Sequence, residues 1–283
     1  MQAPSFSLFL FSLLLFSTSL TGRLNAEDKG KPEDAPPKAP FDPSQARGSR
    51  LPLPSPYDKM LAIEVAAQGK KIQWNKVYDA VAIDLDANSC PDRTSAALAL
   101  GVKIADGLVA VKSQDIEKLN SCATQIESIA KKLGAGDDEL KRARLVRENA
   151  NKGRWLDVFL ELGFLQADIM KILNREENAN ERKLIIALGW MQGARHITYY
   201  LNENYDPEIS NVLREPLLVG ELEKEIQGLP AQSLTHPRVK ALPSAFEQAL
   251  PLVSVEKDQP VPKQNVAKLK AIADAAVKSA LDQ

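Results

Sequence analysis

Hydrophobic residues recur every three or four positions along most of the chain after Pro56, which is the period of an α-helix. One run, 98–111, is apolar on every side and predicts a buried helix. No segment shows the alternation of apolar and polar residues that indicates a β-strand. The sequence therefore predicts an all-α helical bundle, with further helices over residues 72–88, 116–133, 154–173, 180–202, 216–227 and 264–281.

Both ends of the helix over 116–133 can be recognised in the sequence. Ser113 can cap its start, because a serine side chain accepts hydrogen bonds from the first free amides of a helix. Gly134 stands where a glycine commonly ends a helix in a left-handed conformation.

The buried run, LALGVKIADGLVAV, contains two glycines, although glycine weakens the interior of a helix by about 0.5–1 kcal/mol relative to alanine. Small side chains let two helix backbones approach closely, which is a reason to keep them. Gly101 and Gly107 have counterparts in Gly189 and Gly193, within LGWMQGAR. We therefore expect the two helices to be central and to cross at these glycines.

The chain shows signs of an internal duplication. The segments WNKVYDAV (74–81) and WLDVFLEL (155–162) share a frame, and each is followed by the triplet ALG, at 99–101 and 187–189. A third helix follows each triplet, entered through SQDI (113–116) and YDPEI (205–209). The hypothesis is a duplicated three-helix unit over 57–134 and 137–228, followed by C-terminal helices in 229–283.

The N-terminus has the pattern of a secretory signal peptide. Residues 5–20 are uncharged and apolar or hydroxylic, and Ala26 offers a small residue for cleavage. Residues 27–56 then hold eight prolines in thirty positions and predict a disordered linker. We expect the helical domain, 57–283, to be exported to the periplasm or the extracellular space, with no transmembrane segment after cleavage. Retention of the signal as an anchor stays open.

Composition and motifs exclude several classes of function. Lys plus Arg number 36 against 37 Asp plus Glu, without the basic excess of a nucleic-acid-binding protein. The chain contains no nucleophile elbow, P-loop or dinucleotide fingerprint, and no cofactor is expected. No zinc spacing is present, and a calcium loop at 84–95 would have Ser89 and Ser95 where glycine and glutamate are needed. No metal site is predicted.

Cys90 and Cys122 are the only cysteines, and an exported chain with two could bridge them. In a simple helical hairpin turning near residue 112, however, they lie roughly 20 Å apart along the axis, at 1.5 Å per residue. That distance is too long for a disulfide unless Cys90 folds back. A bridge is possible but disfavoured.

The cluster WMQGARHITYY supplies the candidate ligand-binding residues, Trp190, Arg195, His196 and Tyr199. An arginine and a histidine among aromatic rings could line a pocket for a carboxylate or phosphate. The alternative, which the sequence favours for His196, is a solvated helix face. Asp106 also has two candidate partners: Lys103, one helical turn away, and Arg195, across the expected crossing.

Two short motifs resemble those of an uncharacterised family of exported bacterial all-helical proteins. They are LGxxxADG, here LGVKIADG, and LGxxxGxR, here LGWMQGAR. The resemblance covers roughly residues 98–215. It implies a helical exported protein and carries no known activity, so it assigns no catalytic residues.

Together these observations favour an exported binding or scaffolding protein with an unknown protein or small-molecule partner. Helical repeat architectures commonly present binding surfaces, and catalytic signatures are absent. One alternative is a hydrolase or lyase that uses Asp106, Arg195 and His196. A second alternative is a purely structural protein of the cell envelope. The oligomeric state is open.

Overall fold

The structure is a computed structural model that describes residues 62–63, 65–67, 69–85, 87–158, 160–162, 164–165, 178–257 and 259–282, with backbone only for 137–139. The predicted signal peptide and linker, 1–56, lie outside these residues. Within them the chain is helical and contains no strand, which confirms the all-α prediction. The duplication remains a hypothesis.

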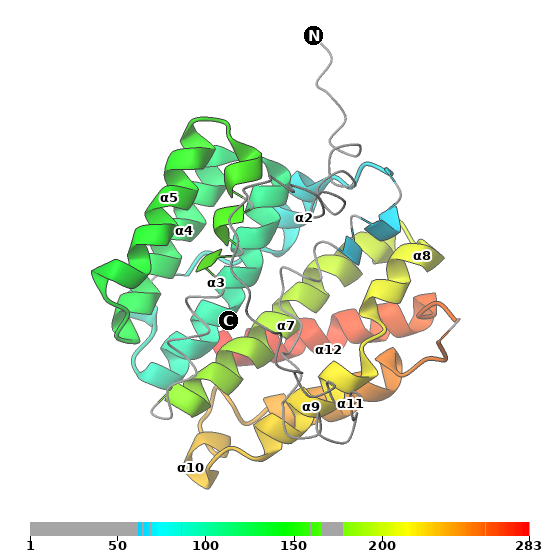
Figure 1. Cartoon of the computed structure of the whole chain (residues 1–283). Coiled ribbons are helices and arrows are strands. Elements are labelled where there is room, and N and C mark those ends of the chain that lie inside the picture. Colours follow the sequence, from blue (N-terminus) through cyan, green and yellow to red (C-terminus); the bar gives the residue numbers. More distant parts are fainter. Residues whose placement is uncertain are drawn as a thin grey trace, which may run out of the picture. The chain divides into compact units, whose positions relative to one another are not determined.

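Two long helices, α3 (Arg93–Ser113) and α7 (Ala179–Glu203), form the centre of the bundle (Figure 1). Asp92 caps the start of helix α3, because its side chain accepts a hydrogen bond from the Ser95 amide at 2.7 Å. The helix ends where Gln114 adopts the left-handed conformation, with φ 53°. Because both helices are surrounded by others, their apolar residues are buried on nearly every side.

The two central helices touch backbone to backbone at Gly101 and Gly189. A Cβ atom on Gly101 would overlap the carbonyl oxygen of Ile185 and lie 3.0 Å from the Gly189 nitrogen. A Cβ atom on Gly189 would lie 3.1 Å from the Gly101 oxygen. This is the close approach that the paired glycines predict. Gly193, by contrast, has nothing within 4 Å of its Cβ position and takes no part in the contact.

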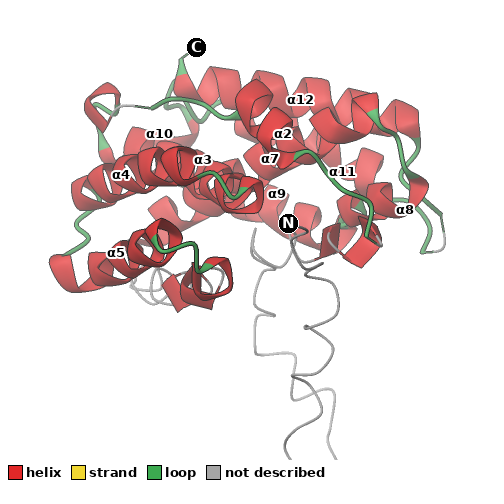
Figure 2. Cartoon of the chain, turned by 90° about the horizontal axis from the view of Figure 1, so that it is seen from above, coloured by secondary structure: helices red, strands yellow, loops and turns green. Residues whose placement is uncertain are grey.

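The other helices pack on either side of this central pair. On the α3 side lie α2 (Trp74–Val81), α4 (Ile116–Lys132) and α5 (Asp137–Asn151), with α4 between α3 and α5 (Figure 2). On the α7 side lie α9 (Pro216–Gln227), α11 (Leu242–Val253) and α12 (Lys263–Leu281). Short helices complete the connections: α8 (Pro207–Ser210), α10 (Ala231–Leu234) and the 3-10 turns Ala87–Ser89 and Asn211–Leu213.

Most of the predicted helices are confirmed, since α4, α7, α9 and α12 begin and end within two residues of the predicted bounds. Gly134 follows α4 with φ 96°, as expected for a glycine that ends a helix. The predicted cap of α4 is wrong: Asp115 accepts the Lys118 amide at 3.1 Å, while Ser113 still belongs to α3. Of the predicted helix 154–173, residues 155–158, 160–162 and 164–165 are helical and the rest lies outside the described residues.

The predicted helix over 72–88 is too long. Helix α2 stops at Val81, and Ala82 turns to an extended conformation with ψ 145°. The periodic residue Leu85 is buried all the same, but it lies in the connection to α3. The backbone groups that would have continued the helix are bound by side chains of α3 and α7 instead.

Among the described residues, one helix, α3, is long and apolar enough to cross a membrane. In the structure 83% of the qualifying window is buried inside the protein. A buried core helix satisfies the same criteria of length and composition, and α3 is a core helix of this bundle.

Candidate functional site

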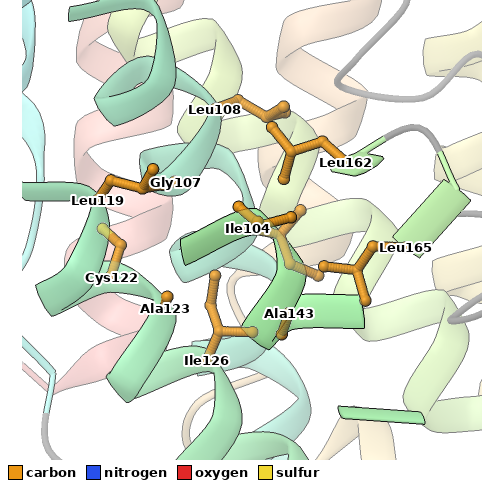
Figure 3. Close-up of a pocket in the computed structure, with 11 residues that line it drawn as sticks. Ile104, Gly107, Leu108, Leu119, Cys122, Ala123, Ile126, Ala143, Leu162 and Leu165 are labelled. Carbon is orange, nitrogen blue, oxygen red and sulfur yellow. The ribbon is translucent and has the colours of Figure 1, made fainter. Parts of the chain in front are cut away.

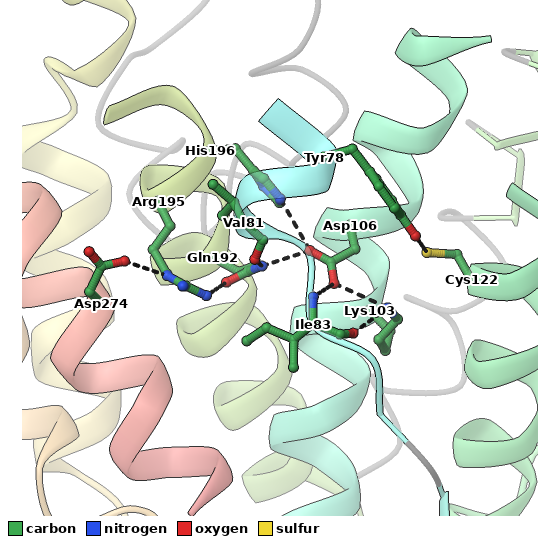
Figure 4. A network of polar contacts seen from close by, with 10 residues as sticks. All are labelled: Tyr78, Val81, Ile83, Lys103, Asp106, Cys122, Gln192, Arg195, His196 and Asp274. Atoms are coloured by element: carbon green, nitrogen blue, oxygen red, sulfur yellow. Dashed lines mark hydrogen bonds and ion pairs between the residues drawn. The ribbon is translucent and has the colours of Figure 1, made fainter. Parts of the chain in front are cut away.

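The carboxylate of Asp106 lies buried where α2, α3 and α7 meet (Figure 4). Its Oδ1 atom accepts a hydrogen bond from Gln192 Nε2 at 2.6 Å and lies 3.1 Å from His196 Nε2. His196 Nε2 is close enough to this oxygen for an ion pair. The angles at Nε2 do not, however, allow a well-directed hydrogen bond. The exposed fractions of Asp106 and His196 are 0% and 2%.

The Oδ2 atom of Asp106 accepts two further hydrogen bonds, each at 3.1 Å, from Lys103 Nζ and from the Ile83 amide. Burial alone would raise the pKa of Asp106, because a low dielectric disfavours the charged form. The contact with the His196 imidazole, the charge of Lys103 and the Gln192 amide outweigh burial, so the pKa of Asp106 lies below its usual range. The carboxylate is therefore ionised at neutral pH.

The same polar residues bind the end of α2. Lys103 Nζ donates to the Ile83 carbonyl oxygen at 2.8 Å, and Gln192 Nε2 lies 3.3 Å from the Val81 oxygen. Together with the Ile83 amide on Asp106, these contacts satisfy backbone groups that a longer α2 would have paired internally. The buried network thus fixes where α2 ends and how the chain turns towards α3.

Of the two candidate partners of Asp106, Lys103 forms the pair and Arg195 does not. Gln192 stands between Asp106 and Arg195, because its Oε1 atom accepts from Arg195 Nη1 at 2.8 Å. Arg195 Nε donates instead to Asp274 of α12 at 2.7 Å, and Lys270 binds the other oxygen of that carboxylate. The network therefore runs from the core to α12.

The predicted solvated face for His196 is wrong. Because α3 packs along this side of α7, the imidazole is enclosed beside Asp106. The second histidine, His236, is partly exposed and lies 3.2 Å from Asp92 at the start of α3. Sequence reasoning missed Gln192, although its position one turn before His196 placed it on the same face of α7.

The structure does not gather the four predicted ligand-binding residues into one place. Trp190 faces α9 and α11: its indole N–H donates to Glu215 at 2.9 Å, and its ring packs against Phe246 with centroids 5.9 Å apart. Tyr199 is half-buried against the core. Arg195 and His196 belong to the network around Asp106. A shared ligand for these residues remains a prediction.

An apolar pocket opens next to the network, between α3, α4, α5 and the helical residues 160–162 and 164–165 (Figure 3). Its volume is about 80 Å³ and its lining is almost entirely apolar. Small residues from three helices create the space, above all Gly107, Ala123 and Ala143. A Cβ atom on Gly107 would lie 3.4 Å from the side chain of Ile126, so this glycine widens the pocket and is not part of the helix crossing.

Cys122 lies on the wall between the pocket and the polar network. Its Sγ atom is 3.1 Å from the hydroxyl of Tyr78. Burial raises the pKa of this thiol, which keeps it protonated, and a protonated thiol is a poor nucleophile. No disulfide joins Cys122 to Cys90, which lies near Lys132 at the other end of α4.

Within the described residues, no group of three or more His, Cys, Asp or Glu side chains could hold a metal ion. Of the acids in the rejected calcium loop, Asp92 caps α3, Asp84 accepts from Gln125, and Asp86 lies outside the described residues.

No protein-family model, no curated protein and no solved structure matches the chain. Its function must therefore be argued from the site itself.

Proposed function

We propose that the chain is an exported binding protein that holds a slender apolar group, such as the end of an aliphatic chain, in the pocket between α3, α4 and α5. The observation that carries the proposal is the pocket itself, about 80 Å³ of apolar space reached between helices. Export rests on the signal-like N-terminus and is part of the proposal.

The size and lining of the pocket support this class of ligand. Sites for complete drug-sized molecules occupy roughly 300–1,000 Å³, so the pocket fits part of a molecule better than a whole one. Apolar cavities exclude water, and filling one with hydrocarbon restores the contacts that its walls lack. Ile104, Leu119 and Ile126 would supply these contacts.

The alternative of a hydrolase or lyase gains less support. Asp106 and His196 do converge, as that alternative requires, but both are buried away from the solvent from which a substrate would come. Their contacts with Ile83 and Gln192 favour a role in holding α2, α3 and α7 together. A purely structural protein would not need the pocket.

The test is calorimetric titration of the purified full chain with dodecanoate. The wild-type chain should bind it saturably at one site. Ala143→Leu fills the pocket and should weaken binding at least about tenfold, whereas Ala271→Leu, on an exposed face of α12, should not change it. Absence of saturable binding, or equal binding by Ala143→Leu, would overturn the proposal.

Two measurements keep the test decisive. Thermal melting followed by circular dichroism shows whether Ala143→Leu is folded, and Gly107→Ala offers a smaller filling if it is not. Native mass spectrometry of the protein purified from its host would show a co-purifying mass that the wild type carries and a filled variant lacks. If both proteins showed only the mass of the polypeptide, this result would count against a ligand bound in the host.

A further inference from the structure

One wall of the pocket is a helical segment that follows α5 in the chain. The described residues of this segment, which we call the outer helix, are 155–158, 160–162 and 164–165. Leu162 and Leu165 line the pocket across from the α4 residue Cys122 (Figure 3). Leu160 and Phe164, elsewhere on the outer helix, are 49% and 54% exposed, so solvent lies beyond this wall. Moving the outer helix would therefore give access to the pocket.

The outer helix is fixed to α5 at its start. The turn between them places Gly153 in the left-handed conformation, with φ 67°, and reverses the direction of the chain. Val158 is fully buried in a small apolar cluster that includes Val146 and Ala150 of α5. This end of the outer helix therefore has its own packed core.

Arg142 of α5 holds the outer helix farther along, beside the pocket. Its Nη1 atom donates to Glu161 at 2.9 Å, and its guanidinium lies 5.1 Å from the centroid of the Phe164 ring. Arg142 and Glu161 each directly precede a residue that lines the pocket, Ala143 and Leu162. The ion pair therefore bridges α5 and the outer helix at the edge of the pocket. Its two side chains are 32% and 22% exposed, so water can replace the contact.

The edge between α4 and α5 is tied at more places. Arg147 pairs with Glu127 near the middle of the two helices. Asn120 donates to Asn151 at 3.2 Å near one end, and the short connection 133–136 joins the helices at the other. Breaking one contact there leaves α4 and α5 held by the others. The edge bridged by Arg142 is the easier one to open.

We propose that the outer helix is the gate of the pocket and that the Arg142–Glu161 ion pair is its latch. The outer helix turns about residues 152–154 while Val158 stays packed. Leu162 then moves away from α4, and an apolar chain end enters between α5 and the outer helix. Local opening of this kind admits ligands to enclosed sites. The gate would admit the ligand of the proposed function, on which this inference therefore rests.

The exposure of the latch sets the size of the expected effect. A partly exposed ion pair contributes little to stability, so its loss should raise the fraction of molecules with an open pocket roughly two- to fivefold. The closed form stays dominant after such a change. Removing the latch should therefore change the rates of access to the pocket far more than the fold.

Cys122 provides a readout that needs no ligand. Its thiol lines the pocket and is fully buried, so N-ethylmaleimide reaches it when the pocket opens. Cys90 is also buried and reduced, but it lies near Lys132 at the other end of α4. Its labelling reports opening elsewhere in the fold. Peptide mass spectrometry of the full chain, labelled for increasing times, gives the two rates separately.

Glu161→Gln should label Cys122 roughly two- to fivefold faster than the wild type and leave the rate at Cys90 unchanged. Added salt should speed the labelling of Cys122 in the wild type, because it screens the latch, and have little effect in Glu161→Gln. The matched control is Glu127→Gln, which breaks the similarly enclosed pair with Arg147. It should label Cys122 at the wild-type rate.

Three results would overturn the gate. Unchanged labelling of Cys122 in Glu161→Gln would mean that the pair holds nothing closed. Faster labelling in Glu127→Gln alone would place the entry between α4 and α5. Equal acceleration at Cys90 would mean that the whole fold had loosened. As a further check, Arg142→Glu with Glu161→Arg exchanges the charges of the latch and should label Cys122 more slowly than Glu161→Arg alone.

Ligand kinetics distinguish failure of the gate from failure of the proposed function. Decanol is an uncharged probe, so loss of the Glu161 charge does not attract it. In stopped-flow mixing, Glu161→Gln should bind and release decanol faster by a similar factor, with a Kd within about twofold of the wild type. A changed Kd at an unchanged association rate would contradict a gate. Latch-dependent labelling of Cys122 without binding of decanol or dodecanoate would keep the gate and remove the aliphatic chain as its ligand.

Discussion

Glycine has different roles at different positions of the two central helices. Gly101 lies against the backbone of α7, so a methyl group there would overlap a carbonyl oxygen that cannot move without shifting the helix. Gly193 lies on α7 itself but faces open space. Replacement by alanine should therefore have opposite effects on stability at the two positions.

We expect Gly101→Ala to lower the free energy of unfolding by about 1–3 kcal/mol, the usual range for overpacking. Gly193→Ala should raise the free energy of unfolding by about 0.5–1 kcal/mol, because alanine is the better helix former and meets no obstacle. Urea unfolding followed by circular dichroism measures both. A loss at both positions, or at neither, would contradict the backbone contact seen at Gly101.

Among the helices, the end of α2 depends most on the buried network. Asp106, Lys103 and Gln192 bind the backbone of residues 81–83, and Asp106 balances the buried charge of Lys103. Removing one partner of a buried ion pair leaves the other uncompensated, which is far more costly than losing an exposed pair. The network should therefore matter for stability as well as for the position of α2.

We predict that Asp106→Asn lowers the free energy of unfolding by about 3–5 kcal/mol. Glu221→Gln, which breaks the exposed pair with Lys224, should change the free energy of unfolding by less than about 1 kcal/mol. Hydrogen exchange supplies an independent readout, since the Ile83 amide donates to Asp106 and should exchange faster in the variant. Unchanged exchange at Ile83 would mean that the network does not hold α2 in place.

The helices predicted well are those in which the spacing of apolar residues in the sequence matches the buried face in the structure. Helices α4, α7, α9 and α12 have clear apolar stripes, and the glycines of α3 and α7 indicated a close approach. Of the longer described helices, α5 was not predicted and is strongly charged, and α11 was foreseen only as one of the C-terminal helices, without bounds, and contains Pro243 and Pro251. Both form because tertiary packing outweighs local propensity.

The site was harder to predict because its parts come from different helices. Lys103 and Asp106 share one helix, so their pairing follows from the helical repeat alone. The link through Gln192 requires the relative rotation of α3 and α7, which no local pattern contains. The pocket likewise exists only where Gly107, Ala123 and Ala143 face the same space.

Across the described part of the molecule, four aspartates with a lowered pKa connect segments that lie far apart in the sequence or on different helices. Their main partners form the pairs Asp92–His236, Asp106–His196, Asp206–Lys70 and Asp274–Arg195. Burial acts to raise the pKa of Asp92, Asp106 and Asp274, but hydrogen bonds and positive partners outweigh it. At Asp206 the hydrogen bond from Lys70 dominates. All four have a pKa below the usual range for aspartate.

These shifts determine how stability should depend on pH. An aspartate of the unfolded chain has a pKa of about 3.9, so on acidification the unfolded state takes up protons before these folded carboxylates do. Their contribution to stability is complete above the unfolded pKa and is lost as the pH falls towards the folded values. The free energy of unfolding, measured with urea across a pH series, should therefore decrease steadily below about pH 4.

Comparison of variants shows how much of this decrease belongs to the core network. Asp106→Asn removes the buried carboxylate, which faces Lys103 and His196, and should give a flatter pH profile as well as lower stability at neutral pH. Glu221→Gln removes an exposed carboxylate and should leave the slope of the wild type unchanged. Asp106→Asn could instead keep the wild-type slope of the free energy of unfolding against pH. The loss of stability in acid would then come from the ion pairs of Asp92, Asp206 and Asp274, and the network around Asp106 would stabilise the fold by packing alone.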